Sequence, residues 1–202
     1  MRKPEQELAD IKSMMERSTR FLSLSGLSGV MAGIYALIGS GMAWYWIEGP
    51  ETLGLASALD HRALMNRLLI LALVVLLLAL VTGYIFSQKK SQKTANKFWS
   101  SAGKRFMSAL FIPVLAGGLF SFALLHESYF NLIPATTLIF YGLGLINASH
   151  FTISELKNLG LIQLMIGLIA GFFPEIGIYC WAAGFGMAHI IYGAMMYYKY
   201  DR

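Results

Sequence analysis

The chain has 202 residues, of which 56% are hydrophobic and only 13% are charged. A typical soluble domain has about twice that share of charged residues, so the composition indicates an integral membrane protein. It argues against a soluble enzyme, a nucleic-acid-binding domain and, with one cysteine, a disulfide-rich secreted module. Six spans of about 20 residues would use about 120 residues, which leaves only connectors and short ends.

Long apolar runs predict an all-α integral membrane protein, with one six-helix bundle over residues 21–202 and short connectors. The predicted spans cover, in chain order, residues 21–47, 68–87, 106–125, 132–149, 153–173 and 176–198. Residues 1–20 carry apolar side chains at near-helical spacing, which predicts an amphipathic helix on the cytoplasmic surface. An extension of the first span explains that spacing equally well.

Local signals define the fifth span. Thr152 followed by Glu155 is a capping-box pattern, so we expect the helix to begin near Ile153. It should end at Phe173, because Pro174 follows. A single kinked helix would run for about 46 residues, far more than one crossing requires, so a turn at Pro174 is the better interpretation.

Lysine and arginine are strongly segregated along the chain. If the N-terminus lies in the cytoplasm, all but two of the 16 fall on the cytoplasmic side, the exceptions being Arg62 and Arg67. Cytoplasmic connectors carry the excess of these residues in membrane proteins. We therefore predict that both termini are cytoplasmic, in a bacterial-type inner membrane.

The connector between the second and third spans is basic and contains no acidic residue. Its six charges are Lys89, Lys90, Lys93, Lys97, Lys104 and Arg105. We expect them to contact anionic lipid headgroups, where each charge contributes about 1 kcal/mol. A docking site for a cytoplasmic partner is the alternative, and no nucleic acid is expected to bind.

The apolar cores of the spans contain no Asp, Glu, Lys or Arg, which argues against proton relays and voltage sensors. Their cytoplasmic halves hold a group of polar side chains, namely Ser25, Ser28, Thr82, Ser108, Asn147, Gln163 and His189. Lipid cannot satisfy these groups, so they should meet one another, backbone or water. The group is either a polar cavity that binds a small molecule or a set of interhelical hydrogen bonds.

Small residues recur at three- and four-residue steps in three spans, which is typical of closely packed helices in membranes. The predicted contact residues are Gly29, Gly33, Ala36, Gly167, Gly171, Gly186 and Gly193. The four histidines are scattered, with only His150 and His189 on the cytoplasmic side, so we predict neither a metal nor a cofactor.

The segments Gly26-Leu27-Ser28-Gly29 and Ala188-His189 resemble the serine and histidine motifs of rhomboid intramembrane proteases. That resemblance implies a serine protease acting through Ser28 and His189. The order departs from the family, because its serine helix lies close in sequence to the histidine helix, and its Trp-Arg element is absent here.

The sequence favours a non-enzymatic membrane module that either binds a small molecule in a transport-associated role or binds a membrane-protein partner or a second copy of itself. A regulatory scaffold that acts through the basic connector is the first alternative. The rhomboid-like protease is the second.

Overall fold

The computed structural model describes residues 21, 24–49, 61–93 and 99–201, and every regular element within them is helical. Six helices in this part of the chain are long and apolar enough to cross a membrane, as predicted. They cover Gly26–Ile47, Ala63–Gln92, Ser101–His126, Phe130–Phe151, Glu155–Phe172 and Pro174–Asp201. The predicted helix over residues 1–20 lies outside the described residues.

The first five spans are built on one long α-helix each, and short 3-10 turns flank the helix of the fourth span and open the last span. The long helices are α2 (Gly26–Ile47), α4 (His61–Lys93), α5 (Ser101–His126), α6 (Ile133–Ala148) and α7 (Glu155–Phe172). The 3-10 turns are η2 (Phe130–Leu132), η3 (Ser149–Phe151) and η4 (Pro174–Ile176). The second helix is longer than predicted, because it begins at His61 and ends at Lys93.

The last span alternates between α-helical and π-helical segments. It consists of α8 (Gly177–Trp181), the π-helical segment η5 (Ala182–Ala188), α9 (His189–Met196) and the π-helical turn η6 (Tyr197–Asp201). Its separation from α7 confirms the predicted turn at Pro174. Phe173 leaves the helical region with φ −128° and ψ 73°, so the chain reverses instead of kinking.

The capping box predicted at the start of the fifth span is wrong. Helix α7 begins at Glu155, and no side chain caps its first turn. The hydroxyl of Thr152 instead donates to the carbonyl oxygen of Phe21, at 2.5 Å, and the Phe21 amide donates to Phe151 O at 2.7 Å. Thr152, which the local pattern assigned to the helix N-terminus, therefore bonds instead to Phe21, a residue distant in sequence.

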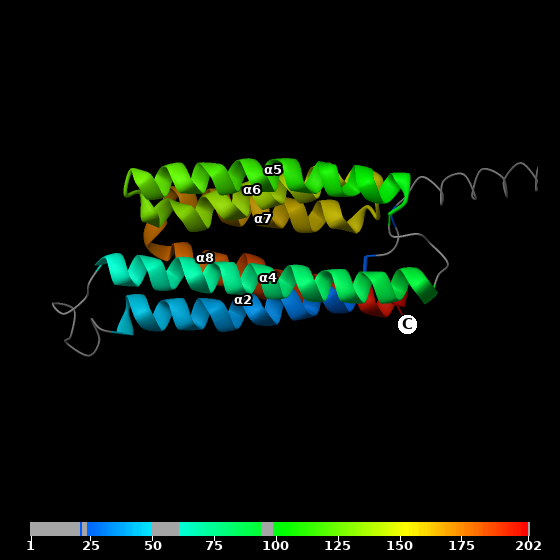
Figure 1. Ribbon diagram of the computed structural model, residues 1–202, viewed down its shortest axis with the longest axis horizontal. Helices are drawn as coiled ribbons and strands as arrows, with labels where there is room; N and C mark the ends of the chain where they lie inside the picture. Colours follow the sequence, from blue (N-terminus) through cyan, green and yellow to red (C-terminus); the bar gives the residue numbers. More distant parts are fainter. Residues whose placement is uncertain (1–20, 22–23, 50–60, 94–98, 202) are drawn as a thin grey trace, which may run out of the picture.

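The helices form two groups (Figure 1). Helices α5, α6 and α7 pack together in one group, while α2 packs against both α4 and the last span in the other. The described ends of the chain meet at one end of the molecule, where the Gly26 amide binds Asp201. We call this the basic end, since the end of α4 with Lys89, the start of α5 with Lys104 and the turn η6 with Lys199 lie there. We call the opposite end the acidic end, since Glu48 follows α2, Glu127 follows α5 and Glu175 belongs to η4.

Glycines allow the backbones of α2 and the last span to touch. A Cβ atom added to Gly33 would lie 2.6 Å from Gly186 O, and one added to Gly193 would lie 2.5 Å from Val30 N. Gly29 faces Gly193 in the same contact, and Ala36 is buried on the same helix. Close backbone approach of this kind is how helices associate in lipid.

A second close contact joins α6 and α7. Cβ atoms added to Gly142 and Gly160 would each lie 2.8 Å from the carbonyl oxygen of the other. A Cβ atom added to Gly167 would lie 2.9 Å from Ile139 N of α6, whereas one added to Gly171 would make only an ordinary contact with Ala135. Gly142 and Gly160 were not among the predicted contact residues.

Replacing Gly33 with alanine should lower the free energy of unfolding by about 1–3 kcal/mol, because the new methyl group meets backbone atoms that cannot move independently. Gly41→Ala is the matched control on the same helix, since its Cβ would meet nothing within 4 Å. The measurement is thermal unfolding of both variants in the same detergent. Equal transition temperatures would show that α2 and the last span are not in contact at Gly33.

The register of α4 on α2 can be tested with a disulfide. A Cβ atom at Gly39 would lie 4.0 Å from the Cβ atom of Val75, within the range of real disulfides. In a Cys180→Ser background, we expect Gly39→Cys with Val75→Cys to cross-link under mild oxidation, as counted by thiol alkylation in intact-mass spectra. Gly41→Cys with Val75→Cys should stay reduced, and cross-linking of the control instead would disprove this register.

Candidate polar site between the helices

Three polar side chains from three spans meet in the interior. His189 at the start of α9 lies between Tyr141 of α6 and Gln163 of α7. Its Nε2 atom is 2.9 Å from Tyr141 Oη, and its Nδ1 atom is 3.2 Å from Gln163 Nε2 and 3.0 Å from Gly184 O. Gln163 Nε2 also donates to Gly184 O at 2.7 Å. We call these three side chains and the Gly184 carbonyl the polar cluster.

The cluster satisfies a neutral imidazole in either tautomer. With the proton on Nδ1, His189 donates to Gly184 O and Nε2 accepts from the Tyr141 hydroxyl. With the proton on Nε2, His189 donates to Tyr141 Oη and Nδ1 accepts from the Gln163 amide. Both ring nitrogens therefore have a partner, and His189 is only 6% exposed.

One atom of the cluster has no partner. Gln163 is fully buried, and its Oε1 atom accepts no hydrogen bond from the described residues. The atom faces Gly184, where an added Cβ would lie 2.6 Å away. A buried amide oxygen without a donor costs about 1–3 kcal/mol, so this position favours a donor from outside the described chain.

Aromatic rings border the cluster on one side. The Phe185 ring lies nearly parallel to the His189 ring, with centroids 5.9 Å apart, and it also contacts Tyr141 and Trp181. Tyr141, Phe185 and Trp181 are all half-buried. The cluster is thus enclosed by protein on the Gln163 side and bounded by partly accessible rings on the other.

The cluster is next to irregular backbone. Gly184 belongs to the π-helical segment η5, and His189, which bonds to its carbonyl, follows five residues later. π-helical turns occur frequently at functional sites.

The structure brings together only two of the seven polar residues that the sequence grouped, Gln163 and His189. Asn147 donates to Ala109 O on α5 at 3.0 Å, and Thr82 donates to Leu78 O on its own helix. Ser108 is exposed.

The two serines of the first span are engaged near the basic end. Ser25 donates to the Asp201 carboxylate, and Ser28 donates to the Ser25 carbonyl. The nucleophile and base suggested by the rhomboid resemblance therefore do not bond to each other, since both nitrogens of His189 are directed to α6, α7 and η5.

Sequence reasoning missed Tyr141 and Gly184. A tyrosine within a span needs a partner for its hydroxyl, and this signal could have added Tyr141 to the polar group. No sequence signal identifies Gly184, because its part in the cluster is a backbone carbonyl.

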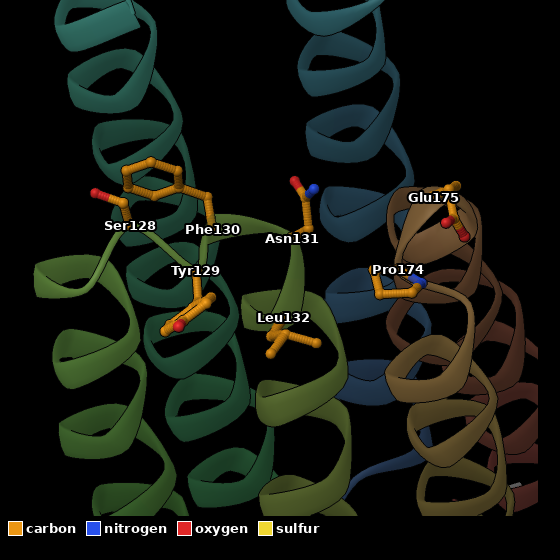
Figure 2. Close-up of a pocket in the computed structure, with 7 residues that line it drawn as sticks. All are labelled: Ser128, Tyr129, Phe130, Asn131, Leu132, Pro174 and Glu175. Atoms are coloured by element: carbon orange, nitrogen blue, oxygen red, sulfur yellow. The ribbon is translucent and has the colours of Figure 1, made fainter.

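A separate hollow of about 400 Å³ lies at the acidic end (Figure 2). The connector between α5 and α6 forms one side, and Pro174 and Glu175 form the other. Ser128 in this connector has a positive φ of 63°. The hollow contains none of the predicted site residues, and its residues come from exposed connectors.

The basic connector is described in part. Lys89, Lys104 and Arg105 are exposed, and Trp99 is 63% exposed. Lys90 is half-buried and pairs with Asp201. Lys97 and the side chain of Lys93 lie outside the described residues.

Within the described ranges, no three His, Cys, Asp or Glu side chains come together as a group that could hold a metal ion. Comparison of the chain with protein-family models, with curated proteins and with solved structures finds no match.

Proposed function

We propose that the protein is a non-enzymatic integral protein of a bacterial-type inner membrane, and that it binds a small molecule at the polar cluster. One observation carries the proposal: Gln163 Oε1 is a buried acceptor without a donor, in a cluster bordered by half-buried rings. A molecule with one hydrogen-bond donor and a flat apolar body would donate to the Gln163 oxygen and pack against the rings.

The alternative interpretation is interhelical hydrogen bonding alone. It accounts for the bonds that His189 and the Gln163 amide nitrogen make, and it leaves the Gln163 oxygen unexplained. Asn147 provides the comparison, because its bond to Ala109 O joins α6 to α5 away from the cluster.

His189→Leu should abolish ligand retention and keep the fold, because leucine has similar bulk and no polar group. Asn147→Leu is the matched control, since it removes an interhelical bond outside the cluster. Each change should lower the free energy of unfolding by about 1–3 kcal/mol. Native mass spectrometry after mild detergent extraction should show the same bound mass in the wild type and in Asn147→Leu, and none in His189→Leu.

Two results would contradict the proposal. One is a wild-type protein that carries no bound mass. The other is a His189→Leu variant that retains the mass while its stability falls as far as that of Asn147→Leu, which would leave interhelical bonding as the role of His189.

The proposed orientation places the basic end in the cytoplasm. It is supported by the position of Lys89, Lys104, Arg105 and Lys199 at one end of the molecule, because positive residues remain on the cytoplasmic side.

A cysteine in place of Glu127, at the acidic end, should react with an impermeant thiol reagent in intact cells. A cysteine in place of Lys104, at the basic end, should react only after the membrane is opened. Both positions are exposed, so burial does not explain a difference. The opposite labelling pattern would reverse the orientation.

A second function is proposed for the basic end, namely binding to anionic lipid headgroups. The exposed side chains of Lys89, Lys104, Arg105 and Trp99 support it, because cations and an aromatic ring suit the membrane interface. A cytoplasmic partner at this surface, and a second copy or another membrane protein against the spans, are the competing proposals.

A further inference from the structure

The end of the chain is bound to the beginning of α2. The Asp201 carboxylate accepts from the Gly26 amide at 2.8 Å and from the Ser25 hydroxyl at 3.0 Å, both through Oδ2. A carboxylate at this position satisfies an amide that has no partner within the helix, and it interacts favourably with the helix dipole.

The other oxygen of the same carboxylate binds α4. Asp201 Oδ1 lies 2.5 Å from Lys90 Nζ, and Lys90 Nζ also donates to Leu24 O at 2.8 Å. The two side chains are only 9% and 15% exposed, so this ion pair is screened less than one in open water. Asp201 therefore connects the last span to α2 and α4 together.

Helix α4 packs mainly against one neighbour. It packs against α2 and makes no comparable contact with another described helix. None of the residues in its most apolar stretch is buried, whereas α2 buries 39% of its own. Apolar side chains gain little free energy when they leave lipid for another apolar surface. A charged contact therefore contributes much of the free energy that holds such a helix in place.

The neighbouring residues of η6 are held independently. Lys199 and Tyr200 both bind the Glu155 carboxylate at the start of α7, the tyrosine at 2.7 Å. The C-terminal turn therefore has two anchors, one on α7 through Glu155 and one on α2 and α4 through Asp201. The second anchor includes α4 through Lys90.

We propose that Asp201 is a latch that holds the basic end of α4 against α2. While the carboxylate binds Lys90, α4 and the start of the basic connector stay docked. When the pair opens, that end of α4 moves away from α2, and the turn η6 stays on α7 through Glu155. The turn η6 thereby controls the position of α4.

The latch can be tested by spin-label distance measurement on the full chain in lipid nanodiscs. Labels at Gln92→Cys on α4 and Met195→Cys on α9 occupy two exposed positions toward the basic end, in a Cys180→Ser background. Asp201→Ala and Lys90→Ala should each move the main distance by about 5 Å or more, a helical turn, or broaden it by that amount. The double variant should show no larger change, because both residues act through one contact.

Glu155→Gln is the matched control, since it weakens the other anchor of the same turn and leaves the Lys90 contact in place. Its distance distribution should match the wild type. An unchanged distribution in both Asp201→Ala and Lys90→Ala would overturn the latch. An equal shift in Glu155→Gln would also overturn it, because any loosening of the C-terminal turn would then move α4. If Asp201→Ala does not fold, Lys90→Ala and Asp201→Asn decide the question by the same criteria.

Discussion

The backbone contact between α2 and the last span is the interaction on which the other contacts depend. In lipid, apolar side chains do not drive helices together, so association needs close packing, which Gly33 and Gly193 permit. The contact aligns the two helices along their whole length. It brings Asp201 to the start of α2 and Tyr179 to the other end, where its hydroxyl bonds to Glu48. Helix α4 then attaches to the surface that α2 leaves open.

Polar side chains inside the spans are subject to a second constraint, because lipid offers them no hydrogen bonds. Thr82 bonds to a carbonyl of its own helix, and Asn147 uses one on a neighbouring helix. In the polar cluster, Gln163 is fully buried, and its nitrogen is bonded while its oxygen accepts no hydrogen bond from the described residues.

Acidic residues at the basic end are used in contacts between elements. Glu155 joins α7 to the C-terminal turn, and Asp201 joins that turn to α2 and α4. Other cations at this end, such as Lys104 and Arg105, are exposed. One end of the molecule therefore combines internal ion pairs with a positively charged surface.

The sequence alone determined the number of spans, their approximate limits and the reversal at Pro174, because hydrophobic runs and proline act locally along the chain. It also indicated Gly33 and Gly193 as residues suited to close contact. Only the tertiary structure decided that Thr152 bonds to Phe21, that Asn147 bonds to α5, and that Gln163 and His189 meet Tyr141. These partners depend on which helices are neighbours and on how each is rotated about its axis. Contacts between residues far apart in the chain set the neighbours and the rotation of each helix, so no local sequence pattern predicts these hydrogen-bond partners.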